Sequence, residues 1–393
     1  MSGYDAVVVG GRVAGAATAL LLARGGLKVG IVERGRPGSD TVSTHAFMRA
    51  GVLQLSRWGL LDAIEGAGTP PVRRTVFHHA GLEPVTVTIR PRGGVEALYA
   101  PRRTVLDRVL LDAALEAGAE LVQGTVAELV RDGARVAGVR LVGSGRSGRT
   151  LRARQTIGAD GIASVVARQA GSEVIRQGRH ASALLYRYYD GLPTDGYEWF
   201  YAPATGAGLI PTNAGQTCAF VSTTPVGMRE LRRAGTEEAF SALLHLAGGP
   251  LAERTLQARP VGRLHGWGGH PGYVRQAHGP GWALVGDAGY FKDPITTHGM
   301  TDALRDAQLL ADAVVATFSG QLLEHVAMAR YQAVRDHLSH QLFDATEAVA
   351  AYDWDTPTIQ RLLREVSASM SDELDHLNGL LPAGATAPAA SGS

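Results

Sequence analysis

The sequence predicts an α/β fold in which a Rossmann-like domain with a parallel sheet is interleaved with an antiparallel-sheet domain and followed by C-terminal helices. Three observations predict it. A β-branched run at 5–9, an Ala/Leu-rich stretch at 14–24 and an apolar run at 28–33 form a strand-helix-strand unit. Residues 183–224 are rich in aromatic and β-branched residues between Gly and Pro breaks, which is typical of an antiparallel sheet. The apolar run 283–287 then returns to the first domain.

The remaining elements follow from periodicity and turn signals. Leu and Val recur at helical spacing over 52–64 and over 103–117. Asp-Gly at 132–133 predicts a two-residue hairpin within the strand-like stretch that follows. A helix is expected over 299–315, and further helices are expected to about residue 380.

The chain is expected to divide into two interleaved domains, because 393 residues exceed one typical domain. The expected FAD-binding domain combines 1–75, 100–180 and 270–320. The expected substrate-binding sheet domain combines 76–99 and 181–269. C-terminal helices are expected over 321–381, and an Ala/Pro/Gly/Ser-rich flexible tail is expected over 382–393.

Composition excludes several classes of partner. The formal net charge is +1 and Lys28 and Lys292 are the only lysines, so no polybasic surface for nucleic acid is expected. Cys218 is the only cysteine, which excludes an internal disulfide and a multi-cysteine metal site. No apolar run reaches the roughly 20 residues of a membrane span, and no signal-peptide pattern opens the chain. We expect a cytoplasmic protein, monomeric or homodimeric, with no metal.

The turn at residues 10–15 is the first sign of a nucleotide site. It lies between strand and helix, the position of a GxGxxG turn, where glycines let the backbone approach a pyrophosphate. Arg12 replaces the middle glycine, so its side chain either obstructs the phosphates or pairs with them. Glu33 ends the second strand at the spacing of a ribose-binding acid. The alternative to a nucleotide site is a strand-helix-strand unit in which these glycines only allow close packing. The candidate contacts are Gly10, Arg12, Val13, Ala14, Gly15, Glu33 and Arg34.

Three segments in sequence order resemble the FAD-dependent monooxygenases of the para-hydroxybenzoate hydroxylase type, over roughly residues 4–320. The first is the turn with Glu33, the second is 158–164 closing with Arg168, and the third is 286–288 followed by Pro294 and Gly299. The resemblance implies that the segment of Asp160 binds both FAD and NAD(P)H, and that Asp287, after Gly286, holds the FAD ribityl chain.

A helix beginning near Gly299 would direct its free N–H groups, with Met300 in its first turn, at the pyrimidine edge of the flavin and stabilise the anionic reduced ring. The family usually continues with His after Gly-Asp-Ala and with Gly-x-Gly-x-Asn later. Tyr290 and Thr297-His298-Gly299-Met300-Thr301 stand here instead, so the detailed flavin contacts are expected to differ.

The resemblance also implies roles for two arginines. Arg49 falls where the family carries an arginine that reaches the FAD phosphates, and Arg103 opens an Arg-x-x-Leu pattern near the isoalloxazine. For each of them, an ordinary surface arginine is the alternative.

Two aromatic clusters predict a substrate pocket. Strand alternation places Tyr186 and Tyr188 on one face and Arg187 and Tyr189 on the other. Aromatic sheet faces over a flavin form a flat, mostly apolar slot, whereas simple core packing is the alternative. The candidate substrate contacts are Tyr188, Trp199, Tyr201 and Pro211, the last in a stretch that resembles the family's proline loop above the ring.

Among the histidines, His45 and His298 are best placed to move a proton near neutral pH, although a lone histidine is often structural. The candidate catalytic residues are His45, His298 and Pro294, whose ring borders the flavin face in the resembling family.

The leading functional interpretation is an FAD-dependent monooxygenase that takes electrons from NADH or NADPH. It would hydroxylate an aromatic or polyketide-like small molecule with O2 through a flavin C4a-hydroperoxide, in secondary-metabolite (antibiotic) biosynthesis. A reductase of the geranylgeranyl reductase type and a cyclase with non-redox FAD are alternatives. A halogenase is less favoured, because no Trp-x-Trp-x-Ile-Pro stretch is present and neither lysine is at the expected place.

Overall fold

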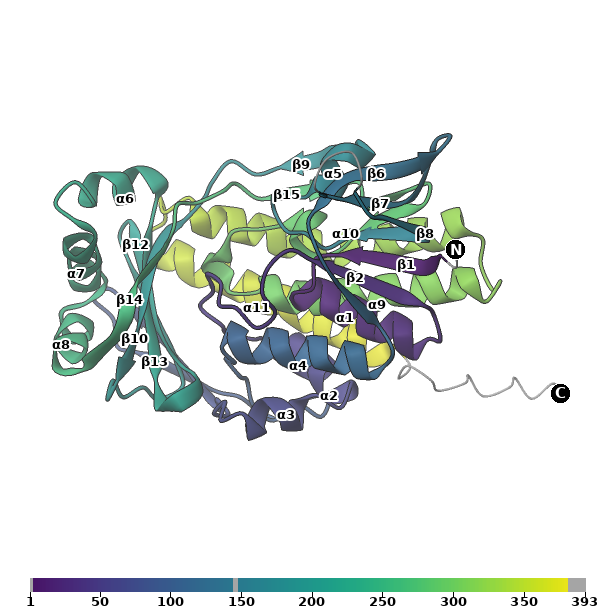
Figure 1. Ribbon diagram of the computed structural model, residues 1–393. Helices are drawn as coiled ribbons and strands as arrows, with labels where there is room; N and C mark the ends of the chain where they lie inside the picture. Colours follow the sequence, from purple (N-terminus) through teal and green to yellow (C-terminus); the bar gives the residue numbers. More distant parts are fainter. Residues whose placement is uncertain (1–2, 144–147, 381–393) are drawn as a thin grey trace.

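The β-branched run near the N-terminus forms an inner strand of a parallel sheet at the centre of the computed structural model, which describes residues 3–143 and 148–380 (Figure 1). The strand order is β16-β17-β8-β1-β2-β5. The strands are β1 (Tyr4–Val9), β2 (Val29–Glu33), β5 (Glu120–Gln123), β8 (Thr150–Gly158), β16 (His278–Gly279) and β17 (Trp282–Leu284). All run parallel except β16, which pairs antiparallel with β17. The predicted Rossmann-like sheet is confirmed.

Both faces of this sheet are covered, which explains why β1 is apolar on both sides. Ala6 and Val8 pack on one face and Val7 and Val9 on the other. The first face carries α1 (Val13–Arg24), α4 (Arg103–Glu116) and α9 (Gly299–Phe318), and the second carries the hairpin β6 (Val126–Asp132) and β7 (Arg135–Leu141) with α5 (Val165–Ala170).

Of the remaining helices of the larger body, two pack directly against α9, one packs against those two, and one lies beside α4. They are α2 (Arg49–Arg57), α3 (Leu61–Gly66), α10 (Glu324–Ala350) and α11 (Thr356–Gly379). Helix was expected to run unbroken over 52–64, and this is wrong: Gly59 adopts φ +72° and separates α2 from α3. The predicted tail 382–393 lies outside the described residues.

A seven-stranded sheet forms the second unit, with order β14-β10-β13-β12-β11-β3-β4. Its strands are β3 (Arg74–His79), β4 (Val85–Thr88), β10 (Ala183–Asp190), β11 (Tyr197–Ala202), β12 (Thr205–Pro211), β13 (Thr217–Thr223) and β14 (Arg259–Trp267). One pairing departs from the predicted antiparallel arrangement, because β11 runs parallel to β3, which enters from an earlier part of the chain.

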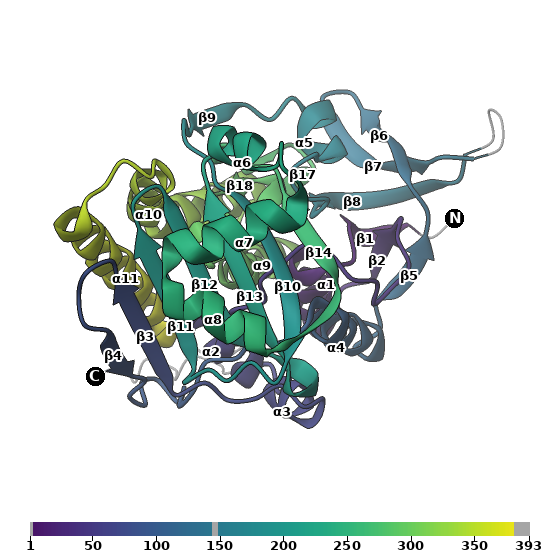
Figure 2. The ribbon, with the colours of Figure 1, turned by 90° about the vertical axis from the view of Figure 1, so that its left-hand side faces the viewer.

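Three helices cover the outer face of this sheet, as Figure 2 shows, while the inner face turns toward the larger body. They are α6 (Pro225–Leu231), α7 (Thr236–Ala247) and α8 (Gly249–Gln257). A small sheet of β9 (Val174–Gln177), β15 (Tyr273–Arg275) and β18 (Tyr290–Phe291) completes the strands, and short 3-10 turns occupy 213–215, 286–288 and 294–296. In the described part of the chain, no helix combines the length and apolar character needed to cross a membrane.

Candidate active site

The three segments singled out in the sequence meet at one edge of the parallel sheet. β1, β8 and β17 are parallel neighbours, so the turns that follow them lie side by side. A Cβ on Gly10 would overlap the carbonyl oxygen of Ala159, and one on Gly286 would lie 2.8 Å from Cβ of Ala14. These two approaches join the first segment to the second and to the third. The edge therefore gathers the free helix ends that a dinucleotide requires.

The turn after β1 is close-packed as a phosphate-binding turn requires. Gly10 has φ +104°, which favours glycine. A Cβ on Gly15 would overlap the carbonyl oxygen of Gly10, so only glycine lets α1 begin this close to the strand. Arg12 is the N-cap of α1, but no side chain caps this end. The amide groups of the first turn, from Val13 and Ala14 onward, are therefore open to an anionic ligand.

Glu33 fixes the shape of this turn. Its carboxylate accepts hydrogen bonds from the backbone N–H of Gly11 at 2.7 Å and from that of Gly35 at 2.6 Å. The carboxylate is buried at the end of β2, and each oxygen retains a lone pair for a ribose hydroxyl. Arg34, the neighbouring candidate, is exposed.

The guanidinium of Arg12 does not cover the turn. It lies 3.2 Å from Asp107 of α4 and donates to Ser39, with its NH2 group 3.1 Å from the hydroxyl oxygen. Asp107 also accepts two hydrogen bonds from Arg103, at 2.9 and 3.1 Å. One buried carboxylate thus holds two arginines beside the turn, where their excess positive charge suits a pyrophosphate.

The carboxylate of Asp160 accepts hydrogen bonds from residues of its own segment, at the start of α5. It accepts from the hydroxyl of Ser164 at 2.5 Å and from the backbone N–H of Val165 at 2.6 Å, which caps α5. Burial raises its pKa, and these donors oppose the shift.

Asp287 is the acid of the third segment. Gly286 before it has φ +58°, which turns the backbone over α1. Among the described residues no donor contacts the Asp287 carboxylate, and burial raises its pKa to about 6 while Arg103 and Lys292 oppose the shift. Asp287 is half-buried, so its carboxylate is suited to accept from a polyol chain.

The first turn of α9 lies near this acid in the chain and is also uncapped. His298 is the N-cap residue, but its side chain makes no cap hydrogen bond. A Cβ built on Gly299 would meet nothing within 4 Å, so the helix end faces open space. Met300, in the same turn, has its sulfur 4.0 Å from the hydroxyl oxygen of Ser43. Pro294 lies in a separate short turn, whose N-cap Asp293 is buried.

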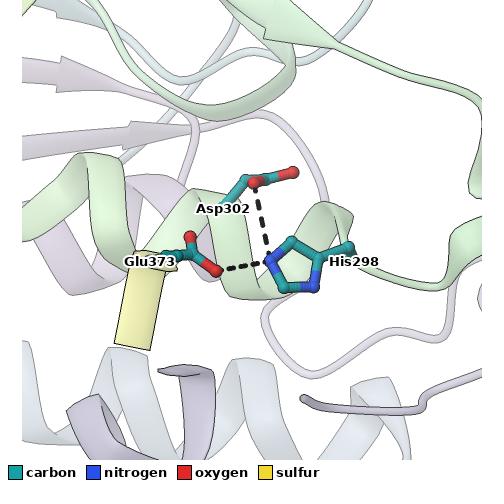
Figure 3. Close-up of side chains that lie close together, drawn as sticks. All are labelled: His298, Asp302 and Glu373. Atoms are coloured by element: carbon teal, nitrogen blue, oxygen red, sulfur yellow. Dashed lines mark hydrogen bonds and ion pairs between the residues drawn. The ribbon is translucent and has the colours of Figure 1, made fainter. Parts of the chain in front are cut away.

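The side chain of His298 points into a buried ion cluster rather than toward the open end of α9. Figure 3 shows it beside Asp302 and Glu373, the latter from α11. Nε2 of His298 lies 2.6 Å from Glu373, while Arg305 contacts Asp302 at 3.1 Å and Glu373 at 3.0 Å. Lys292 forms an ion pair with Asp302. All five side chains are at most 4% exposed.

This cluster has the ligand types of a metal site but not the charge balance. Ligand atoms of His298, Asp302 and Glu373 lie within 4.8 Å of one another. Lys292 and Arg305 already form ion pairs with Asp302 and Glu373, which disfavours a further cation. The pKa of Glu373 is lowered to about 2 despite its burial, because His298, Arg305 and Lys292 stabilise its charge. We interpret the cluster as an ion-pair network that joins α9 to α11.

His45 lies on the opposite side of the site, against the inner face of the second sheet. It is buried with φ +71°, an unusual backbone conformation for histidine, and its Nε2 forms a hydrogen bond with the hydroxyl of Tyr188. The guanidinium of Arg102 stacks 3.3 Å from the centre of the Tyr188 ring. Burial lowers the pKa of His45 well below its usual value, with Arg103 and Arg102 adding to the shift. The imidazole is therefore neutral at pH 7.

The predicted alternation of β10 is confirmed. Tyr186 and Tyr188 pack in the inner cluster, whereas Arg187 forms an ion pair with Glu237 of α7 and Tyr189 packs under the outer helices. The Tyr186 hydroxyl accepts from the backbone N–H of Ser43 at 3.3 Å. Since Ser43 also reaches Met300, the loop before α2 connects the aromatic face to α9.

The other candidate substrate residues and Arg49 lie in different parts of the second sheet and its surroundings. Trp199 belongs to the same inner cluster as Tyr188, and Tyr201 packs at its border against Trp354. Pro211 ends β12 opposite Thr217. Arg49 donates to the backbone carbonyl of Arg90 at 3.1 Å, which directs it toward the β4 region.

Several residues of the site were not singled out in the sequence, among them Arg102, Asp107 and Glu373. Arg102 directly precedes the predicted helix, and Asp107 lies four residues after Arg103, which is a helical ion-pair spacing that could have revealed it. No sequence pattern around Glu373 indicates its role, because its partners lie 68 and 75 residues earlier in the chain.

Comparison with known proteins identifies an FAD-binding family. A family model described as "FAD binding domain" matches residues 3–346. "Probable electron transfer flavoprotein-quinone oxidoreductase YdiS" of Escherichia coli K12 is 28% identical over 368 residues, covering 84% of this chain and 80% of that protein. Digeranylgeranylglycerophospholipid reductase 1 of Methanococcoides burtonii is 25% identical over 399 residues, covering 97% and 92%.

Solved structures share the fold. The flavin-dependent brominase Bmp2 superimposes with a TM-score of 0.80 at 18% identity, covering 96% of this chain and 99% of that chain. The structure of pqsL, described as a probable FAD-dependent monooxygenase from Pseudomonas aeruginosa, gives 0.76 at 22% identity, covering 94% and 100%. At such identities the likeness establishes the fold alone.

Proposed function

Because this chain belongs to the FAD-binding domain family, we propose that it is an NAD(P)H-using flavin monooxygenase that hydroxylates an aromatic or polyketide-like small molecule in a biosynthetic pathway. The chain is an FAD-dependent oxidoreductase, and the proposal concerns its reaction and substrate class. The observation that carries it is the contact of buried His45 and Tyr188 with half-buried Arg102. This group lies on an aromatic sheet face that is connected through Ser43 to the first turn of α9.

The residues at the sheet edge fit FAD. The open first turn of α1 and the guanidinium groups of Arg12 and Arg103 would hold the pyrophosphate, and Glu33 would accept from the adenosine ribose. Asp287 would accept from the ribityl hydroxyls.

The pyrimidine edge of the flavin would face the first turn of α9 from Gly299 onward, where three amide N–H groups lack a cap. Bound FAD would supply the chemistry of hydride acceptance and O2 activation, and the protein would supply position and electrostatics.

The substrate would lie between the flavin and the inner sheet face. The pKa of Tyr188 is raised by burial, so its hydroxyl is protonated and can donate to a substrate oxygen or to His45. Arg102 would stabilise negative charge that develops on an electron-rich ring. The buried surroundings would exclude water from the reacting atoms.

A second candidate function is double-bond reduction. The similarity to a digeranylgeranylglycerophospholipid reductase over 97% of this chain favours it. The same FAD-binding residues would serve a reductase, and the two reactions differ in their need for O2.

Purified protein would test the proposal. We expect flavin absorbance near about 370 and 450 nm, and oxidation of NADH or NADPH that is accelerated by an aromatic substrate and yields a product with one added oxygen under air. The Tyr189→Phe variant, altered on the outer sheet face, serves as a control and should behave as wild type. Product formation without O2, with two hydrogens added, would replace the monooxygenase proposal with the reductase. Failure to take up added FAD would contradict both.

A further inference from the structure

A cavity at the free edge of the second sheet lies outside the groups described above. Its volume is about 550 Å³, within the usual range for small-molecule pockets. It lies between β10, β14 and α6, and its lining includes Arg229, Arg232, Arg263, Glu237, His265 and Trp267. β14 is the outermost strand of the sheet, so the cavity opens at the sheet edge.

The charge of this cavity is strongly positive. Arg229, Arg232 and Arg263 are exposed, and within the described residues none of them forms an ion pair. The one lining acid, Glu237, is already paired with Arg187. Three guanidinium groups therefore remain without a counterion, which suits a carboxylate or phosphate.

An irregularity in β14 places one of these arginines. Tyr186 of β10 pairs with His265 of β14, and Tyr188 pairs with Val261. Two steps along β10 therefore correspond to four steps along β14, which is a β-bulge. Gly262 in this bulge has φ +72°, a conformation that favours glycine. Bulges of this kind redirect side chains beside functional sites. Here the extra residues bring Arg263 to the cavity.

The cavity is connected to the candidate active site by direct contacts. His265 lines the cavity and stacks on Tyr186, with ring centres 4.9 Å apart. Tyr186 in turn contacts Tyr188 edge to face at 5.9 Å and accepts from Ser43, which reaches Met300 of α9. His265 therefore stands between the cavity and the aromatic face that contains Tyr186 and Tyr188.

We propose that this cavity binds an anionic group, a carboxylate or a phosphate ester, carried by an organic ligand. The inference goes beyond the proposed function, because it adds a binding site that is separate from the residues that would hold FAD. Arg232 and Arg263 are the specificity-determining residues, because they belong to different elements and would hold the anion from two sides.

Binding of 1-naphthyl phosphate and of uncharged 1-naphthol to the FAD-loaded protein, measured by equilibrium dialysis, tests the proposal. We expect Arg232→Gln and Arg263→Gln each to weaken naphthyl phosphate binding about tenfold and to leave naphthol binding unchanged. Arg233→Gln, an exposed neighbour outside the cavity lining, is the matched control and should remain within about twofold of wild type. Retained flavin absorbance shows that each variant is folded.

Equal naphthyl phosphate affinity in all three variants would overturn the proposal. A loss of NADPH affinity in Arg263→Gln without a loss for naphthyl phosphate would assign the cavity to the nicotinamide nucleotide instead, and would also overturn it. Failure of the monooxygenase function is distinguishable, because in that case the phosphate-specific effect persists while no oxygen is transferred to any substrate.

Discussion

Nε2 of His298 lies 2.6 Å from a carboxylate oxygen of Glu373, and this contact ties the N-terminal end of α9 to the last helix of the described chain. The same carboxylate binds Arg305 through its other oxygen at 3.0 Å. Because the first turn of α9 is the proposed partner of the flavin, we expect this contact with α11 to hold that turn in place.

Glu373→Gln is expected to destabilise the protein by about 3–5 kcal/mol, because it breaks the buried contacts of the Glu373 carboxylate with Arg305 and His298. Urea unfolding measures the free energy difference. Glu365→Gln on the same helix is the control: Glu365 pairs with Arg361 at 2.6 Å on the surface, so its loss should cost less than about 1 kcal/mol. Equal effects of the two variants would contradict a central role for the cluster.

The cluster also predicts an acid limit of stability. The folded pKa of Glu373 is about 2, below its ordinary value of 4.5, so its contribution is present above pH 4.5 and is lost as the pH falls toward 2. Wild type should therefore lose stability over this window more steeply than Glu373→Gln. Parallel curves of unfolding free energy against pH would show that another group sets the acid limit.

Gly15→Ala is expected to abolish tight FAD binding and to cost about 1–3 kcal/mol of stability, because the added Cβ overlaps the carbonyl oxygen of Gly10. Gly66→Ala is the control, since a Cβ there meets nothing within 4 Å and the residue is helical. Its unfolding free energy should stay within about 0.5 kcal/mol of wild type. FAD fluorescence quenching measures affinity, and retained affinity in Gly15→Ala would argue against the turn as the phosphate site.

Asp287→Asn should act in opposite directions on the free and the FAD-bound protein. The folded pKa of Asp287 is about 6, above its ordinary 3.8, so the cost of ionising this buried carboxyl is fully present above pH 6 and disappears as the pH falls toward 3.8. The apoprotein variant should be more stable than wild type by about 1 kcal/mol at about pH 8, after allowance for partial exposure, and less so at lower pH.

FAD affinity of the same variant should fall about tenfold, because an amide is a poorer acceptor for ribityl hydroxyls than a carboxylate. Urea unfolding of apoprotein and a flavin titration give the two quantities separately. A parallel loss of stability and affinity would identify Asp287 as a structural residue only.

Tyr188→Phe is expected to lower kcat/KM for the aromatic substrate by about tenfold to a hundredfold, since it removes the hydroxyl that binds His45. Flavin content and the rate of NAD(P)H oxidation without substrate should not change. Tyr189→Phe is the matched control on the opposite face of β10, packed under the outer helices. Identical effects of the two variants would place the reaction away from the inner face.

Several features could be predicted from the sequence because they depend on local geometry. Strand alternation separated Tyr186 and Tyr188 from Arg187 and Tyr189, and the structure places them so. The turns after β1, β8 and β17 were expected in one site from the resemblance to the FAD-dependent monooxygenases, and they meet because parallel strands end at the same edge of a sheet. The break between α2 and α3 was missed, since apolar spacing continued across Gly59 while its backbone did not.

Only the tertiary structure decided which side chains meet. His45 and Tyr188 are 143 residues apart, His298 and Glu373 are 75 apart, and Arg12 finds Asp107 at a separation of 95. The sequence by itself determined the elements and the nucleotide-binding turn, because periodicity and glycine placement report backbone conformation. Its resemblance to the FAD-dependent monooxygenases indicated the cofactor. The sequence could not determine ion partners or the arginine-lined cavity, because these depend on how distant elements pack, and no local pattern records that packing.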